Sequence, residues 1–430
     1  MNRQIEQIYI SHHNELTNSL SALTKEIKSE ALKTLRQHGL PGHKDEFWRK
    51  TDWKNHIESR LQLKRPGVFE PPSNASDYDF FLTDGILYGK QNLVQYDNGI
   101  IAGSLAQATL QFPGLVEKYF HRIVKPKFNN LSALNTLLFR DGFFLYVPEG
   151  VACDRNIRII NMVTEAQKQS QFHQRNLIVL EPDASVNVEV YDTGSSQADA
   201  FITDLTEIRS GQNAVLNYYR RQDLPEKVSL VNMNYSENES RSLLHAHIMT
   251  FNGEYIRNEV FSFLKGEEAD VNWRGIYLPD TDQKVDNRIF IIHDAVRTLS
   301  NQQFKGILQD RSRSFFNGYI LVERGAQQTN AYQQNANLLL SRRAKASSYP
   351  FLEIYADDVS CSHGSTTGQL DDEALFYIRQ RGIDEQTARK MILRSFAGEV
   401  IDTLPQEAWR ADADKYLDKK LSASNVLETV

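Results

Sequence analysis

The sequence predicts a mainly β protein with a right-handed parallel β-helix core at residues 78–368. An N-terminal helical domain at 1–77 and a C-terminal helical domain at 369–430 are expected to flank it. Three observations predict this fold class. Short apolar runs of period two fill the central region, long helical periodicity is missing from most of it, and a 3.6-residue period occurs on both sides.

The N-terminal region predicts an amphipathic helix that packs on a larger body. Its apolar positions recur at spacings of three and four residues: Leu16, Leu20, Leu23, Ile27, Ala31 and Leu35. Gly39 and Pro41 predict the end of this helix. Pro66, Pro71 and Pro72 then predict a linker.

Short strands separated by polar turns dominate the central region. Val186, Val188 and Val190 alternate with polar residues, and Phe261 and Phe263 do the same. This region is longer than a single β-sandwich domain. A β-propeller would need a blade repeat of about 40–50 residues, and the sequence shows none. A solenoid accommodates coils of irregular sequence because each coil needs only inward apolar residues that stack on its neighbours.

The C-terminal domain is predicted to contain three helices. The first spans Asp372 to Arg381 after a cap at Asp371, the second begins after Asp384, and the third follows Pro405. The second helix carries an apolar stripe of Ala388, Met391, Ile392, Phe396 and Val400. Such a stripe is usually core, and the second interpretation is a docking surface for another protein.

Composition excludes several classes of partner. The net charge is −6, and without a basic block the sequence favours neither nucleic acid nor an anionic membrane as a partner. Apolar runs stay well below the roughly 18 residues of a membrane span. Met1 to Leu16 has no continuous apolar core, so we expect no export signal and a reducing, cytoplasmic location.

The cysteine content limits the metal chemistry. Cys153 and Cys361 are the two cysteines of the chain. They make no disulfide framework, and they cannot supply the four thiolates that usually hold an iron–sulfur cluster. Any cluster bound here needs other ligand types or a second chain, and no role is predicted for Cys153.

The first chemical candidate is the tripeptide Cys361-Ser362-His363. On a strand, Cys361 and His363 would share one face, with Asp357 further along it. Thiolate and imidazole together suit iron, zinc or cuprous copper. The alternative interpretation is a small buried cysteine beside a surface histidine. Because two ligands leave a metal half-coordinated, the site needs a partner to complete it.

Other candidates predict less. His245, His247 and His293 are interpreted as turn or surface histidines. The pair Asp357-Asp358 would suit a β-helix carbohydrate-active enzyme, but adjacent strand residues point to opposite faces and cannot bracket one glycosidic bond. A simple metal-binding module is the other alternative function.

One glycine-rich segment has to be considered for ATP binding. Gly85 to Lys90 is one residue short of a phosphate-binding loop, and Gln91 stands where that loop has Ser or Thr. Any use of ATP is therefore expected on another chain.

A long ordered set of motifs resembles the SufB/SufD family of iron–sulfur cluster assembly proteins. These motifs are Lys305–Leu308, Ser312–Ser314, Gly325–Gln333, Asn337–Leu340, Pro350–Asp358, Cys361–Gly364, Ala374–Tyr377 and Arg381–Ile383, with Gly39–Pro41 and Lys44–Trp48 near the N-terminus. Gly42-His43 stands where the family often has Thr-Arg. The Cys-Ser-His-Gly form, the modest length and the few cysteines are most similar to the SufD branch.

The resemblance implies a non-catalytic scaffold that pairs with SufB through the β-helix and docks the SufC ATPase through its C-terminal helices. It places Cys361 and His363 at the SufB interface, with His363 preferred as the group that contacts a transient iron or nascent cluster shared with SufB. The expected ATPase-docking residues are Tyr377, Arg381, Ala388, Met391, Ile392 and Phe396. No tightly bound cofactor is expected, a flavin is placed on no residue, and the isolated chain is a candidate homodimer.

Overall fold

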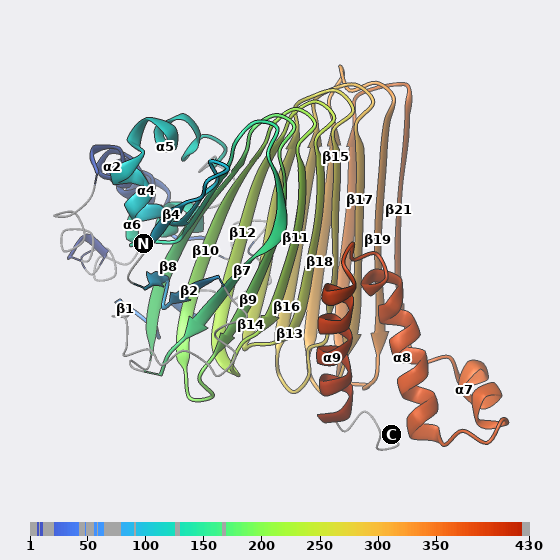
Figure 1. Cartoon of the computed structure of the whole chain (residues 1–430). Helices are drawn as coiled ribbons and strands as arrows, with labels where there is room; N and C mark the ends of the chain where they lie inside the picture. Colours follow the sequence, from blue (N-terminus) through green and yellow to red (C-terminus); the bar gives the residue numbers. More distant parts are fainter. Residues whose placement is uncertain are drawn as a thin grey trace.

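Two facing β-sheets form the body of the molecule, and helices flank them at both ends (Figure 1). The structure is a computed structural model that describes residues 7, 9–11, 21–42, 48, 56–57, 59–63, 79–89, 92–124, 130–165 and 169–423. From β8 onward, each coil of the chain gives one strand to each sheet, and these strands pair in parallel. The predicted parallel β-helix is confirmed, and it makes about seven turns.

The strands fall into two sheets in the described part of the chain. The eleven-stranded sheet contains β1 (Gln62–Leu63), β4 (Leu93–Gln95), β5 (Ile101–Ser104), β6 (Phe143–Val147), β8 (Ser170–Leu180), β10 (Asp199–Ser210), β12 (Lys227–Asn238), β14 (Tyr255–Leu264), β16 (Lys284–His293), β18 (Arg313–Val322) and β20 (Lys345–Ile354). The ten-stranded sheet contains β2 (Phe80–Thr83), β3 (Ile86–Tyr88), β7 (Ala152–Val163), β9 (Ser185–Gly194), β11 (Val215–Asp223), β13 (Leu243–Asn252), β15 (Asp270–Tyr277), β17 (Leu299–Leu308), β19 (Thr329–Leu339) and β21 (Val359–Gly368).

Seven helices are described with their bounds. They are α2 (Ala22–His38), α4 (Leu105–Gln111), α5 (Pro113–Tyr119), α6 (Asn130–Leu138), α7 (Asp372–Arg379), α8 (Glu385–Ile401) and α9 (Glu407–Ala423). The helices α4, α5 and α6 lie inside 78–368, where the sequence predicts only β-structure. They are short, so they show little of the long helical period on which that prediction depended. At the other end, β21 stops at Gly368.

The same structural features recur once in every coil of the solenoid. In the ten-stranded sheet, stacked residues from Ser185 to Ser360 follow one another at intervals of 27 to 31 residues. One turn of each coil holds a left-handed residue with φ between 55° and 61°: Asp183, Asn213, Arg241, Glu268, Arg297 and Gln328. The N–H of each donates to a carbonyl of the next coil, at 2.6–3.2 Å. A small buried residue follows each one: Ala184, Ala214, Ser242, Ala269, Thr298 and Thr329.

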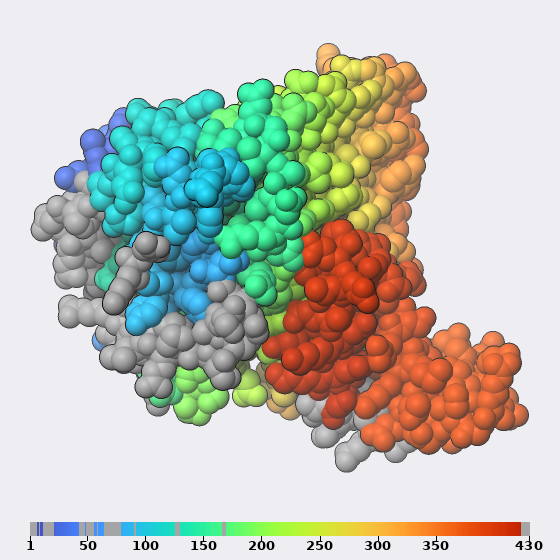
Figure 2. Space-filling view, in the orientation of Figure 1, coloured from blue at the N-terminus to red at the C-terminus, as the bar shows by residue number. Residues whose placement is uncertain are grey.

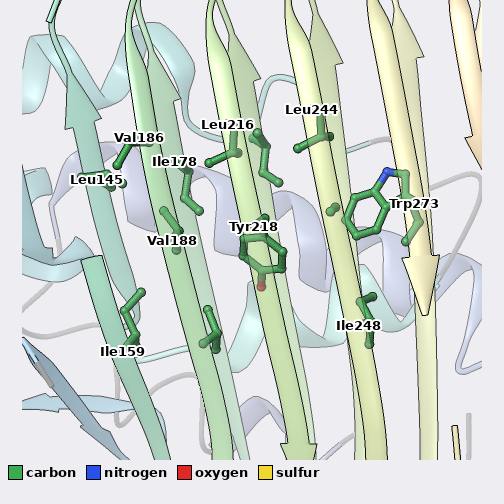
Figure 3. Close-up of a cluster of buried hydrophobic side chains, with 14 of the residues drawn as sticks. Leu145, Ile159, Ile178, Val186, Val188, Leu216, Tyr218, Leu244, Ile248 and Trp273 are labelled. Carbon is green, nitrogen blue, oxygen red and sulfur yellow. The ribbon is translucent and has the colours of Figure 1, made fainter. Parts of the chain in front are cut away.

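The interior between the sheets is built from rows of like side chains. Figure 3 shows Val186, Leu216 and Leu244 at one level of successive coils. These residues are at most 2% exposed, because both sheets cover them. Each coil therefore buries its apolar residues mainly against its two neighbours, as in other solenoids.

A polar row runs through the same interior. The Nδ2 of Asn232 donates to Oδ1 of Asn258 at 3.0 Å, and Asn258 Nδ2 donates to Asn287 Oδ1 at 2.9 Å. Parallel, in-register strands permit such a ladder because identical amides lie one above the other. Arg220 caps it by donating from Nη1 to Asn232 Oδ1 at 2.8 Å.

Arg220 is also held by two buried carboxylates. Its Nε donates to Asp192 Oδ2 and its Nη2 to Asp204 Oδ2, both at 2.7 Å. Burial raises the pKa of Asp204, and the guanidinium opposes this shift. The three side chains are at most 4% exposed, so the ions depend on one another for solvation.

Helices cover opposite sheets at the two ends. The buried face of α2 includes Ile27, Ala31 and Leu35, while Leu16 and Leu20 of the predicted stripe lie outside the described residues. Gly39 ends the helix with φ 71°, as predicted. This face joins α6 and the outer side of the eleven-stranded sheet.

Lysine 28 fixes α2 to the end of α6. Its Nζ donates to the carbonyls of Leu137 at 2.9 Å and Phe139 at 2.7 Å. Burial lowers the pKa of Lys28 well below its usual value. A cation at the carbonyl end of a helix also meets the negative end of the helix dipole.

The C-terminal helices begin where the sequence predicts. Asp371 and Asp384 cap α7 and α8, and each accepts backbone N–H bonds through its side chain. Leu393, Ala397 and Val400 of α8 pack with Trp409 of α9 on the outer side of the ten-stranded sheet. In Figure 2, α7 and the start of α8 form a lobe that stands away from the solenoid.

Removing the positive charge from the interior should be costly. We expect Arg220→Met to lower the free energy of unfolding by about 3–5 kcal/mol, because it leaves Asp192 and Asp204 buried without their cation. Urea unfolding followed by circular dichroism measures this change.

The surface pair Arg311–Asp282 supplies the matched control, because both side chains are more than half exposed. Arg311→Met should change the stability little. Adding Asp192→Asn and Asp204→Asn to Arg220→Met should restore part of the loss. An Arg220→Met variant as stable as Arg311→Met would contradict the interpretation.

Stability should also depend on pH through His293. Burial lowers the pKa of His293 to about 3, and both ring nitrogens lie 2.8 Å from hydroxyls, of Thr298 and Ser300. The ring is neutral in the folded chain but takes up a proton below about pH 6.5 when unfolded, so stability is complete above that pH and falls as the pH is lowered toward 3.

From pH 6.5 to 5 this one residue should remove about 2 kcal/mol. Unfolding titrations at both pH values should give a smaller loss for His293→Gln. An equal loss in the variant and the parent chain would show that the folded and unfolded rings take up protons alike over this range, which would contradict the lowered pKa of His293.

Candidate functional site

The last coil of the solenoid holds the predicted metal ligands. Among the described strands, β20 pairs with β18 alone and β21 pairs with β19 alone, so each is the edge of its sheet. Residues that are buried in earlier coils become half-buried or exposed here. Pro350 within β20 fits an edge position, because proline cannot donate a ladder hydrogen bond.

Cys361 and His363 both continue rows that face the interior. The row of Cys361 runs through Val271, Ser300 and Ala331 in the preceding coils. Val271 belongs to the interior core, so alternation along β21 directs both Cys361 and His363 to the inner side. The predicted shared face is confirmed.

The two side chains differ in exposure. Cys361 is half-buried against Ile320, Val322 and Ala331, and burial raises the pKa of its thiol. His363 is exposed, because no further described coil lies beyond β21. A metal arriving from the open end would reach the imidazole first, and it would have to displace a proton from the thiol.

Asp357 does not extend this face. It lies in the turn before β21, and the strand begins only at Val359. Asp358 lies in the same turn, where its backbone N–H donates to Gln327 Oε1 at 2.9 Å. The strand alternation used in the sequence argument therefore does not apply to these two carboxylates.

The described residues contain no cluster of three or more His, Cys, Asp or Glu side chains that could hold a metal. Cys361 and His363 are thus at most two ligands of a site. Cys153 lies on β7, and its Sγ donates to the carbonyl of Arg155 at 3.4 Å. Because β7 and β21 lie far apart in the strand order of the same sheet, the two thiols do not meet.

The interpretation as turn or surface histidines was wrong for His247 and His293, which are buried, while His245 is half-buried. His245, His247 and His293 all lie in strands, and the last two are 0% exposed. His247 Nε2 lies 2.9 Å from the hydroxyl of Thr403, which follows α8. A hydroxyl so far away in the sequence could not be assigned to a histidine from local patterns.

An aromatic stack leads to the open end on the outer side of the eleven-stranded sheet. Successive rings of Tyr235, Phe261, Phe290, Tyr319 and Phe351 lie with centroids 4.7–5.7 Å apart. Tyr235 is 0% exposed, whereas Phe351 on β20 is 53% exposed. The stack was not predicted from the sequence, although an aromatic residue at one-coil intervals is its signal.

Further apolar side chains are exposed on the last two coils. They are Tyr332, Tyr349, Ile354 and Tyr355, each between 39% and 50% exposed. Tyr332 lies on β19, Tyr349, Phe351 and Ile354 lie on β20, and Tyr355 follows β20. We call this set of five residues the terminal edge. Exposed aromatic groups of this kind are typical of contact surfaces.

The predicted docking residues divide between surface and core. Tyr377 is 59% and Met391 46% exposed, and Arg381 lies over the Tyr377 ring at 4.1 Å. Ile392 and Phe396 are half-buried, with Lys305 over the Phe396 ring. Ala388 is fully buried, so it supports α8 from within and does not reach the surface. Phe376, which was not among the predicted docking residues, is 64% exposed beside Tyr377.

A cavity of about 560 Å³ bears on the carbohydrate-enzyme alternative. Its carboxylates are Asp79, Glu189 and Asp412. Asp412 pairs with Arg221, Asp79 with Arg155, and Glu189 accepts from Tyr191. Carboxylates paired in this way stabilise the lining of the cavity. The arrangement does not resemble the general acid and nucleophile of a glycosidase.

Comparison with known proteins assigns the family. Residues 162–396 match the model of the SUF system FeS cluster assembly SufBD core domain, and residues 1–159 match the SufBD protein N-terminal region. In the described residues, no helix is long and apolar enough to cross a membrane.

Curated relatives agree with this match. The chain is 38% identical over 162 residues to the iron–sulfur cluster assembly protein SufD of Escherichia coli, a match that spans 38% of each chain. It is 28% identical over 328 residues to SufD of Bacillus subtilis, covering 76% of this chain and 75% of that one. The chloroplastic protein ABCI7 of Arabidopsis thaliana is 27% identical over 418 residues, 93% of this chain and 86% of its own. The chain therefore belongs to the SufBD family of the SUF iron–sulfur cluster assembly system.

Proposed function

We propose that this chain is a non-catalytic scaffold subunit of the SUF complex, of the SufD type, acting in the cytoplasm. The observation that carries the proposal is that the two candidate ligands, Cys361 and His363, lie on β21, the last described strand of the solenoid, beside the exposed side chains of the terminal edge. A scaffold whose metal site is completed by another subunit needs its own ligands and its contact surface in the same place.

Pairing with SufB takes place through the terminal edge. Each of β20 and β21 pairs with a described strand along one edge only. The backbone N–H and C=O groups along the other edge can pair with a strand from another chain. Phe351 and Tyr355 supply apolar surface beside them. In the absence of SufB, the same edge lets two copies of this chain form a homodimer.

Iron or a nascent cluster is the cargo of this site. His363 contacts it first and Cys361 adds a thiolate, while SufB supplies the remaining ligands. Imidazole and thiolate suit iron, and a cluster usually needs four ligands. No tightly bound cofactor is required of this chain.

The SufC ATPase docks on the lobe formed by α7 and the start of α8. Phe376 and Tyr377 project there with more than half of their surface exposed, and Arg381 stacks on Tyr377. Aromatic and arginine side chains are the common energetic centres of protein interfaces. ATP hydrolysis belongs to SufC in this proposal.

Loss of the imidazole should weaken iron binding. We expect His363→Gln to lower the iron affinity of the reconstituted complex by about tenfold or more, since one ligand is lost at a site with few. Iron content of the purified complex, measured by mass spectrometry at limiting iron, reports the change.

His38 on α2 is also exposed and lies at the opposite end of the chain. His38→Gln therefore makes the same substitution away from the edge and should leave iron content unchanged. If His363→Gln and His38→Gln bind equal iron, the metal role of His363 is wrong.

Removing the aromatic pair should weaken the ATPase contact. The double variant Phe376→Ala, Tyr377→Ala should bind SufC at least about 30-fold more weakly by calorimetry, as expected when interface anchors are truncated. Both side chains are exposed, so the free chain should remain folded.

Tyr88 on β3 is 55% exposed and provides the control, Tyr88→Ala. SufC affinity equal to that of the control would exclude α7 as the docking element.

A further inference from the structure

A pair of buried glutamines lies directly behind His363. In the ten-stranded sheet, the row of His363 runs back through Gln333 and Gln302 to Trp273. Gln302 is 0% and Gln333 2% exposed. Burying an amide without hydrogen bonds is costly, so each polar atom of these two side chains is expected to need a partner.

The bond between the two amides fixes their direction. Gln333 Nε2 donates to Gln302 Oε1 at 2.8 Å, which directs the nitrogen of Gln333 toward the preceding coil. Gln333 Oε1 is buried, and no donor to it is found among the described residues. The next residue along the row is His363, one strand spacing of about 4.8 Å away.

The opposite sheet is shaped to hold these amides. Gly318 of β18 faces them, and a Cβ added there would overlap the Nε2 of Gln333 and lie 2.9 Å from Gln302 Oε1. Glycine at this position thus leaves the space that the glutamine pair occupies. Residues of both sheets thus shape the space for the two glutamines, and their row continues to His363 on β21.

We propose that Gln333 is a positioning residue that sets the tautomer and orientation of the His363 imidazole. The His363 side chain is exposed and, in this proposal, turns so that one ring N–H donates to Gln333 Oε1, which has no donor in the described structure. The other ring nitrogen then carries its lone pair toward the open end. In metal sites the hydrogen bond made by one ring nitrogen selects which nitrogen binds the metal. This inference rests on the proposed metal role of His363.

The test reads the tautomer directly in the full-length chain without metal. Ring ¹⁵N chemical shifts of ¹⁵N-histidine-labelled protein at pH 8 give the ratio of the two neutral tautomers, and His363→Gln assigns the signal. Relative to the parent chain, Gln333→Met should change this ratio by about fivefold, the value of one ordinary hydrogen bond.

The neighbouring residue provides a matched control. Gln334 is exposed on the other face of β19, so Gln334→Met should leave the ratio unchanged. Gly318→Ala should displace the Gln333 amide and reproduce the Gln333→Met result without changing Gln333.

The two proposals fail in different ways. A Gln333→Met ratio equal to that of Gln334→Met overturns the positioning role, whatever the iron content. If circular dichroism shows that Gln333→Met misfolds, Gly318→Ala still decides the question. The inference is wrong if the tautomer ratio of Gly318→Ala equals that of Gln334→Met. A fixed tautomer together with unchanged iron in His363→Gln leaves the positioning role standing and removes the metal role.

Discussion

In-register stacking of one coil on the next is the constraint on which the rest of this structure depends. Every interior position meets the same position in the neighbouring coils, so a side chain is stabilised mainly by residues about one repeat away. This explains why apolar rows such as that of Val186 and Leu216 coexist with the amide ladder of Asn232 and Asn258. Apolar rows pack, and polar rows form hydrogen bonds, between like residues of successive coils.

The candidate site follows from the point at which this stacking ends. In the middle of the solenoid, a thiol or an imidazole on an inward row would be sealed by the next coil. In β21 the same rows lack a described successor, so Cys361 keeps a partly open surface and His363 is exposed. A reactive pair can therefore sit on interior rows and still be reached, provided that it occupies the last coil.

The sequence could predict the architecture because period-two runs and helix caps are local signals. Asp371, Asp384 and Gly39 lie at helix ends as expected. The coil repeat was harder to detect, because its left-handed residues include Asn213, Arg241 and Gln328, which share a conformation and no chemistry. What recurs is the small buried residue that follows, which a search for longer blade repeats overlooks.

Site residues were predictable only where the chemistry itself is unusual. Cys361 and His363 could be selected from two cysteines and a strand spacing. The glutamine row could not, because Gln302 and Gln333 become neighbours only through strand pairing, and the space for them depends on Gly318 across the interior. The burial of Ala388 likewise depends on how α8 meets a sheet far away in the sequence.

The attachment of α8 has a mechanical consequence. The helix packs on β15 and β17, and Lys305 of β17 forms an ion pair with Glu399 at 2.5 Å. Its foundation is thus on inner strands, away from β21. A force applied to the projecting α7 would therefore reach the solenoid by two routes. It would act on the end of β21 through the short connection of residues 369–371, and it would act on the inner strands β15 and β17 through α8.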